Sequence, residues 1–212
     1  MKAGYHPIKK GGNDMTQIIM ATGNMNKVKE IRQMLEGTDL TVLSLKDAGI
    51  EADIDENGTT FEENAAIKAE TIRDLTGKVV MADDSGLEID ALGKAPGIHS
   101  SRFMGEDTPY TIKNQAILDK LKDVPEEERT ARFVCAVAIA FPDAPTKVFR
   151  GTFEGRIAYE IKGENGFGYD PIFFVPEMGC TSAELSPEVK NSMSHRGKAL
   201  ALAVDELRQC RI

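Results

Sequence analysis

The sequence has no tryptophan, and its three cysteines, Cys135, Cys180 and Cys210, lie far apart. An odd number of cysteines without metal-ligand spacing predicts reduced thiols, which excludes a disulfide framework and a zinc site. The longest wholly apolar run, Phe133 to Phe141, is too short to cross a bilayer, and no N-terminal segment resembles a secretion signal. We therefore expect a cytoplasmic protein with no membrane partner.

Basic residues are also in the minority: 26 lysines and arginines stand against 34 aspartates and glutamates, a formal net charge of −8. Binding to a nucleic-acid backbone requires a basic surface that replaces condensed counterions, so we expect no nucleic-acid partner. The first fourteen residues lack a periodic apolar pattern, and Met15 opens a clean strand pattern. We expect residues 1–14 to be an unstructured extension upstream of the natural start, and residues 15–212 to form a single domain.

Apolar periodicity predicts the secondary structure along the rest of the chain. Predicted strands cover 17–21, 40–45, 78–82, 130–141, 146–155 and 171–175, and predicted helices cover 26–36, 59–75, 108–121, 186–193 and 198–207. Thr60 and Glu63 form the pattern of a capping box at the second helix. Because strands alternate with helices early and then follow one another, we expect an α/β fold with a mixed sheet and flanking helices.

The stretch "ATGNMNKVKE" joins the first strand to the first helix and contains Lys27. Free backbone N–H groups at a helix start, together with a lysine, make a potential anion site. The spacing of a Walker phosphate loop is absent, which removes the main support for a kinase or an ATPase. Taken alone, this stretch favours an ordinary strand-to-helix turn.

Lys68 is predicted to lie on an apolar helix face. At 3.6 residues per turn it falls in the middle of a stripe formed by Phe61, Ala65, Ile72 and Leu75. Its side chain either runs along the apolar surface to reach water or directs its ammonium into a cleft to meet an anion. The pattern gives the two interpretations equal weight.

Asp83 and Asp84 stand together at the end of the predicted strand 78–82, before an expected turn through Ser85 and Gly86. If the strand continues through them, the two side chains point in opposite directions, so one faces a cleft and the other braces the adjoining backbone. Two unpaired buried carboxylates are costly, and a bound cation relieves that cost. Mg²⁺ takes one or two protein carboxylates, and the acidic loop "DIDENG" offers a second one from Asp55 or Glu56.

Two later stretches combine glycine, aromatic and cationic residues. In "GENGFGYDPIFF", Phe167 and Tyr169 offer an aromatic platform on which a planar base can stack, although hairpin-turn chemistry explains the glycines equally well. In "KNSMSHRGKAL", Lys190, His195 and Arg196 gather hydrogen-bond donors near a helix start. Such donors suit a base carbonyl or a phosphate.

Taken together, the motifs resemble those of the inosine triphosphate pyrophosphatase family. They stand here as "ATGNMNKVKE", "ENGTTFEENAAIKA", "ADDSGL", "KAPGIHSSRF", "GFGYDPIFF" and "SHRGKAL", in the family's order, and the resemblance runs from Gln17 nearly to the C-terminus. It implies an elongated mixed sheet with flanking helices, two lobes around a nucleotide cleft, and a homodimer. It also implies Mg²⁺-dependent cleavage of ITP, dITP and XTP to the monophosphate and pyrophosphate.

The resemblance also implies roles for individual residues. Asp84, Lys68 and Asp83 are expected to be catalytic, with Asp84 binding Mg²⁺ or acting as a general base. Asp55 stands where we place the family's second metal carboxylate, with Glu56 as the neighbouring alternative. The purine nucleoside triphosphate is expected to contact Thr22, Gly23, Asn24, Met25, Asn26, Lys27, Ser85, Phe167, Gly168, Tyr169, Asp170, Lys190, His195 and Arg196.

Two other functions would use the same pocket. One is a nucleotide-binding sensor without hydrolysis, against which the intact Asp84 and both lysines count. The other is a pyrophosphatase for pyrimidine nucleotides, against which the "FGYD" and "SHR" stretches favour a purine.

Overall fold

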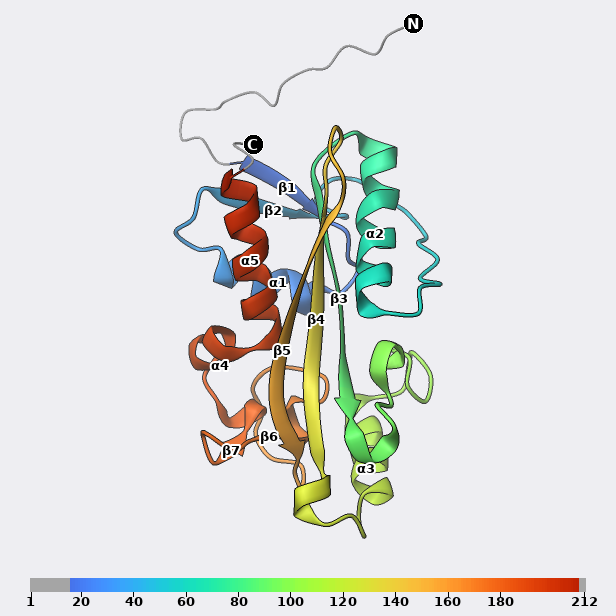
Figure 1. The fold of residues 1–212 in the computed structure, drawn as a ribbon, viewed down its shortest axis with the longest axis vertical. Coiled ribbons are helices and arrows are strands. Elements are labelled where there is room, and N and C mark those ends of the chain that lie inside the picture. Colours follow the sequence, from blue (N-terminus) through green and yellow to red (C-terminus); the bar gives the residue numbers. More distant parts are fainter. Residues whose placement is uncertain (1–15, 210–212) are drawn as a thin grey trace, which may run out of the picture.

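The protein is described by a computed structural model over residues 16–209, so the predicted extension 1–14 and Met15 lie outside the described residues (Figure 1). A seven-stranded sheet has the order β2-β1-β3-β4-β5-β6-β7. Its strands are β1 Thr16–Met20, β2 Leu40–Ser44, β3 Val80–Ile89, β4 Thr130–Ala140, β5 Lys147–Ile157, β6 Phe173–Val175 and β7 Cys180–Thr181. The α-helices are α1 Met25–Met34, α2 Phe61–Thr76, α3 Tyr110–Lys120, α4 Pro187–Met193 and α5 His195–Gln209.

The sheet is mixed, as predicted. Strand β1 pairs in parallel with β2 and β3, whereas the pairs from β3 to β7 are antiparallel. Figure 1 shows β3, β4 and β5 running along the length of the molecule, with β1 and β2 crossing near one end and β6 and β7 near the other. The prediction of an elongated mixed α/β sheet with flanking helices is confirmed.

Helices cover both faces of the sheet, and β3 contributes to both cores because its side chains alternate. Met81 packs in the cluster beneath α1 and α5, whereas Val80 and Ala82 pack in the cluster beneath α2. A third apolar cluster contains residues of α3, β6 and the far ends of β3 to β5. Successive side chains of β3 therefore pack against different helices, alternately α1 with α5 and α2.

Strand β3 does not end at the acid pair, contrary to the sequence prediction. It continues to Ile89, because β4 supplies an antiparallel partner at each position, including Cys135 opposite Ser85. Gly86 is a strand residue and not a turn residue. A Cβ atom there would lie 2.3 Å from the carbonyl oxygen of Gly97, so this glycine permits a close approach of two chain segments.

Helix α2 begins as predicted, with one difference in its cap. The Thr60 side chain accepts a hydrogen bond from the Glu63 backbone N–H, but the Glu63 carboxylate bonds to Thr59 and leaves the capping box half formed. Of the predicted apolar stripe, Leu75 is 65 % exposed, so its predicted burial is wrong. Position along the helix, as well as the angle around it, decides whether a side chain meets the sheet.

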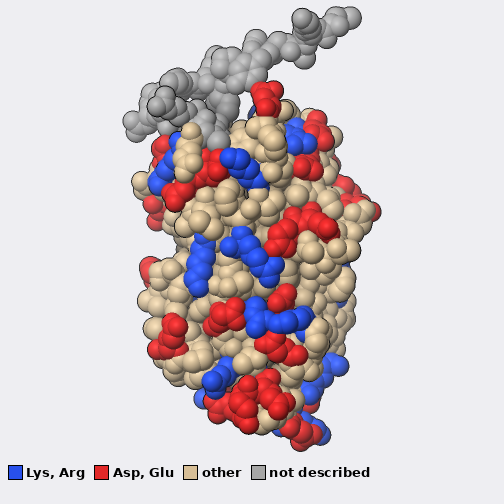
Figure 2. Space-filling view, in the orientation of Figure 1, with Lys and Arg blue, Asp and Glu red and all other residues tan. Residues whose placement is uncertain are grey.

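The surface agrees with the acidic composition. On the face drawn in Figure 2, acidic and basic side chains are interspersed among uncharged ones, without a continuous basic area. Among residues 16–209, no helix combines the length and apolar character needed to span a membrane.

Candidate active site

A cavity of about 360 Å³ opens where β3 continues past its parallel neighbour. Strand β1 pairs with β3 only at Ile19 and Met20, and the chain then turns away into α1. The cavity lies beyond this point, at the carboxyl end of β1, where Ala21, Asp84 and Ser85 line it. Carboxyl ends of parallel strands are the usual ligand sites of α/β folds, and the volume lies within the range of small-molecule sites.

Most of the predicted site residues line this cavity. They are Thr22, Gly23, Asn24, Lys27, Lys68, Asp84, Ser85, Phe167, Gly168, Tyr169, Asp170, Lys190, His195 and Arg196. Met25 and Asn26 do not line the cavity, because they lie exposed on the first turn of α1. Asn24 caps that turn by accepting hydrogen bonds from the backbone N–H groups of Asn26 and Lys27.

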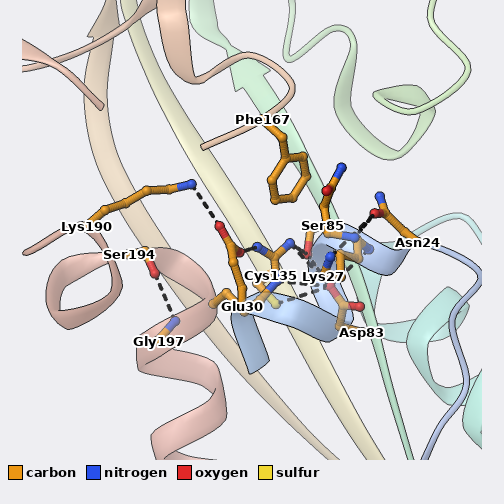
Figure 3. Close-up of polar contacts among 12 residues, drawn as sticks. Asn24, Lys27, Glu30, Asp83, Ser85, Cys135, Phe167, Lys190, Ser194 and Gly197 are labelled. Carbon is orange, nitrogen blue, oxygen red and sulfur yellow. Dashed lines mark hydrogen bonds and ion pairs between the residues drawn. The ribbon is translucent and has the colours of Figure 1, made fainter. Parts of the chain in front are cut away.

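Asp83 lies fully buried on the face of β3 that meets α1 and α5 (Figure 3). Its Oδ2 atom lies 3.0 Å from the Lys27 ammonium and 3.5 Å from the Arg196 guanidinium, and it accepts a hydrogen bond from the Ser85 hydroxyl. Burial acts to raise the pKa of Asp83, but Lys27 and Arg196 outweigh it and hold that pKa well below its usual range. Asp83 therefore braces two side-chain cations, where we had expected it to brace backbone.

Asp84 points to the opposite face, toward α2, as the strand alternation predicts. Its Oδ1 atom accepts a hydrogen bond from the Lys68 ammonium at 3.0 Å, and the same ammonium donates to Glu56 at 2.9 Å. Burial raises the pKa of Asp84 and exceeds the opposing attraction of Lys68, so this pKa lies above its usual value. Asp84 is thus the more basic carboxylate of the adjacent pair.

Lys68 lies buried among these carboxylates at the cavity wall. Burial acts to lower its pKa, but the charges of Asp84, Asp83 and Glu56 outweigh this effect and raise the pKa above its usual value. The ammonium therefore stays charged and meets anions in the cavity. Of the two interpretations of Lys68, the structure supports the cleft and not the route along apolar surface to water.

Glu56 lines the cavity, and Asp55 does not. Residues 51–58 belong to no helix or strand and alternate between exposed and half-buried side chains, with Asp55 exposed beside Asn57 and Glu56 half-buried. The carboxylate that the fold brings to Lys68 is thus the alternative, Glu56, while the metal-binding role of either residue stays a prediction. Ala52 and Ile54 stand at alternate positions before Glu56, and this apolar alternation in the sequence indicated that Glu56 faces inward.

The carboxylate oxygens of Asp84 and Glu56 suit a hard cation that takes its remaining ligands from water and substrate. Among residues 16–209, no group of three or more His, Cys, Asp or Glu side chains has a metal-ligand arrangement. Asp84 and Glu56 nevertheless converge on one ammonium in the cavity. A pair of carboxylates fits Mg²⁺, which keeps waters and substrate phosphates as its remaining ligands.

Glu30 of α1 is a site residue that the sequence analysis missed. Figure 3 shows the Glu30 carboxylate directed at the Lys190 ammonium, which lies 3.0 Å away. The same carboxylate forms a second ion pair with Arg196. Glu30 follows Lys27 by three residues, and so it lies on the same face of the helix. This spacing was the one sign in the sequence that Glu30 belongs to the site. The ion-pair partners of Glu30, Lys190 and Arg196, lie more than 150 residues away in the chain.

The aromatic loop is held by Asp170, which is almost fully buried. The Asp170 carboxylate accepts hydrogen bonds from the Phe167 backbone N–H, the Ser182 hydroxyl and the Lys190 ammonium. Its oxygens are therefore engaged with the protein, and its effect on a ligand acts through the loop that it shapes.

Of the two predicted platform residues, Phe167 is partly exposed and Tyr169 is not. Phe167 is half-buried, with the cations of Lys190 and Arg196 at 5.4 and 5.7 Å from its ring centroid. Tyr169 is buried, and its hydroxyl donates a hydrogen bond to the Ser100 carbonyl oxygen. The predicted platform is thus reduced to Phe167.

A sequence model of one protein family, described as the Ham1 family, matches residues 18–206. The chain belongs to the Ham1 family. It is 50 % identical to the dITP/XTP pyrophosphatase of Bacillus licheniformis over 186 residues, which cover 88 % of this chain and 95 % of that protein. It is 45 % identical to the dITP/XTP pyrophosphatase of Photorhabdus laumondii, covering 92 % of this chain and 99 % of that protein.

Solved structures of the Ham1 family share this fold. The Staphylococcus aureus Ham1 protein matches with a TM-score of 0.82 and 41 % identity, covering 92 % of this chain and 99 % of that chain. A HAM1 protein from Coxiella burnetii matches with a TM-score of 0.82 and 40 % identity, over 92 % of this chain and all of that one. The resemblance on which the sequence analysis relied is confirmed.

His195 of this Ham1-family chain opens helix α5 at the cavity. Its ring stacks on Phe133 with a centroid distance of 4.9 Å, and its Nδ1 atom has no hydrogen-bond partner among residues 16–209. Burial lowers the pKa of His195 well below 6.5, and the nearby charges of Arg196 and Lys190 lower it further. The imidazole is therefore neutral at pH 7 and offers one donor and one acceptor.

This neutral histidine predicts a loss of stability in mild acid. Below the unfolded-state pKa of about 6.5, the unfolded chain binds a proton at residue 195 that the folded chain cannot bind, so acid favours unfolding. From pH 7 to pH 5 we expect this one group to remove up to about 2 kcal/mol of unfolding free energy. Urea unfolding of the wild type and His195→Gln at both pH values measures it. Equal pH slopes for the two proteins would show that His195 does not contribute.

Proposed function

We propose that the protein hydrolyses dITP, XTP and ITP between the α and β phosphates, releasing the nucleoside monophosphate and pyrophosphate. The observation that carries the proposal is that one cavity is lined by two chemically different sets of groups. We assign the carboxylate and lysine cluster around Asp84 to the phosphate end of the substrate, and Phe167 with the donors of His195 and Arg196 to its base end. The names of the relatives, dITP/XTP pyrophosphatases, support the same substrates.

The phosphate end attracts anions in two ways. The N-terminus of α1 directs its partial positive charge toward the turn at Thr22 to Asn24, which lines the cavity. Lys27 and Lys68 add two full charges, held in place by Asp83 and Asp84 respectively. We infer that the triphosphate lies along this wall.

The base end suits a purine with a carbonyl at C6. Phe167 provides a stacking face, and Arg196 and His195 lie within the same cavity. A carbonyl at C6 accepts a hydrogen bond from such donors, whereas the amino group of adenine leaves a buried donor unpaired. This arrangement favours hypoxanthine and xanthine over adenine.

For the reaction, the chain positions groups more than it supplies covalent chemistry. Asp84, with its raised pKa, orients the attacking water and takes its proton, while Lys68 stays charged beside the developing pyrophosphate. Lys27, fixed by Asp83, offsets negative charge on the phosphates. Mg²⁺, which Asp84 and Glu56 are suited to hold, would neutralise phosphate charge when bound.

The proposal includes Mg²⁺ as the cofactor, a homodimer as the assembly and a cytoplasmic location. The carboxylates of Glu56 and Asp84 support the cofactor, because both line the cavity, both pair with Lys68, and a pair of carboxylates suits Mg²⁺. A divalent cation held there would also offset the charge of a polyanionic substrate.

The proposed activity predicts a definite product and substrate order. With Mg²⁺ present, dITP, XTP and ITP should release pyrophosphate with kcat/KM about 100-fold or more above that for ATP, because adenine leaves a donor unpaired. Phosphorus NMR identifies the product, and chelation by EDTA should abolish turnover until Mg²⁺ is restored. Release of orthophosphate, absence of turnover, or ATP as the best substrate would each contradict the proposal.

A further inference from the structure

Helix α3 carries a buried side chain that the proposed mechanism does not use. Asn114 is 2 % exposed and does not line the cavity. Its Nδ2 atom donates a hydrogen bond to the Gly168 carbonyl oxygen at 3.1 Å. Its Oδ1 atom is buried and has no partner among residues 16–209.

Because of that unpaired oxygen, stability alone does not explain an asparagine at position 114. A buried acceptor without a hydrogen bond is destabilising, and an apolar residue of similar size would avoid that penalty. Residues that break a local packing rule are expected where function requires them. The Nδ2 amide group of Asn114 does form a hydrogen bond, and its acceptor, the Gly168 carbonyl oxygen, belongs to the loop that carries Phe167.

The loop around Phe167 is fixed from two sides. Asp170 accepts a hydrogen bond from the Phe167 backbone N–H at 2.8 Å, and Asn114 donates to the carbonyl of the next residue, Gly168. The Phe167 ring is attached between these two anchors. Gly168 has a φ of +71°, a conformation that glycine adopts with little strain, so its own backbone restrains the loop weakly.

The same helix also holds the facing wall of the cavity. Lys113, the residue before Asn114, donates a hydrogen bond from its fully buried ammonium to the Ser101 carbonyl oxygen at 2.6 Å. Tyr110 packs edge-on against Tyr169, with ring centroids 5.1 Å apart. Helix α3 therefore links the aromatic loop to the Ser100–Ser101 segment, which also lines the cavity.

We propose that Asn114 is a positioning residue for base discrimination: its amide fixes the Gly168 carbonyl and thereby holds the Phe167 ring in register with the donors of His195 and Arg196. The inference rests on the proposed function. Without this anchor, the Phe167 plane shifts, and a stacked base no longer presents its carbonyl to these donors at hydrogen-bond distance. Substrates that depend on those hydrogen bonds lose more than substrates that do not.

Asn114→Leu tests this inference, because leucine keeps the volume and removes both the donor and the unpaired oxygen. We expect kcat/KM for dITP to fall about tenfold, chiefly through KM, and the preference for dITP over dATP to fall by a similar factor. The melting temperature should stay near that of the wild type. Gln115→Leu is the matched control, since Gln115 is exposed on α3 and bonds only within the helix, to Asp119; it should change neither value.

Asn114→Asp is the second variant, because it keeps the shape and its ionised form lacks the donor; assayed at pH 9 to favour that form, it should show the same loss of preference. A preference within twofold of the wild type in either folded variant overturns the inference. An equal loss of kcat for both nucleotides that follows the melting temperature also overturns the inference, because it indicates a structural role. Failure of both variants to fold overturns it for the same reason. If the wild type does not cleave dITP, the proposed function fails as well, whereas cleavage with unchanged preference defeats this inference alone.

Discussion

Asp84→Asn should lower kcat for dITP by about 10³-fold or more, because it removes a general base and a carboxylate suited to Mg²⁺ in one change. The amide has nearly the same shape but accepts a proton far less readily. It also leaves Lys68 with Glu56 as its remaining direct ion-pair partner. Steady-state kinetics at saturating Mg²⁺ measures the loss.

The fold should survive this substitution. Burial of the Asp84 charge is already unfavourable, as its raised pKa shows, so replacing the carboxylate with an amide relieves part of that cost. We expect the unfolding free energy to change by about 1 kcal/mol or less, measured by urea unfolding. Near-normal turnover in the folded variant would refute the role of Asp84.

Asp83→Asn should have the opposite profile, with a loss of about 3–5 kcal/mol of unfolding free energy. Asp83 is fully buried, and its Oδ2 atom lies between the cations of Lys27 and Arg196. Without that carboxylate, two desolvated positive charges from α1 and α5 lose their shared counterion. Urea unfolding at pH 7 measures the effect, since the depressed pKa of Asp83 means that its contribution is complete above about pH 4.

Asp90→Asn provides the matched control on the same segment. Asp90 follows β3 and also pairs with an arginine, Arg132, but its side chain is 31 % exposed to solvent. Exposed ion pairs contribute about 0–1 kcal/mol, so this variant should unfold near the wild-type urea concentration. If Asp83→Asn costs no more than Asp90→Asn, the buried carboxylate does not hold the two cations in the way described here.

The two predictions separate neighbouring carboxylates by the face of β3 on which each lies. Asp84 faces α2 and the cavity, where chemistry is proposed, and Asp83 faces α1 and α5, where it organises cations. The alternation of a strand was enough to predict this opposition. The sequence assigned the cavity to Asp84 only through the family resemblance. The hydrogen bond between Lys68 and Asp84 now gives a geometric reason for that assignment.

Most secondary-structure elements were predictable because local periodicity reflects burial on one face. The apolar stripe placed Lys68 on the inward face of α2 but left the position of its ammonium open, and Thr60 predicted the start of α2. The prediction failed at Leu75 and at the end of β3. Strand β3 continues because β4, whose residues lie about 50 positions further along the chain, pairs with it through the acid pair and beyond. No local pattern contains that partner.

The candidate site divides in the same way. The sequence alone determined the α/β class, the motifs that assign the family, and most of the residues that line the cavity. Tertiary structure alone decided that Glu30 joins Lys190 and Arg196 and that Asn114 bonds to Gly168 beside Phe167. The physical reason is distance along the chain: Glu30 and Lys190 are 160 residues apart, and Asn114 and Gly168 are 54 apart. Periodicity reports only which face a residue presents, whereas the order and direction of the strands decide what that face meets.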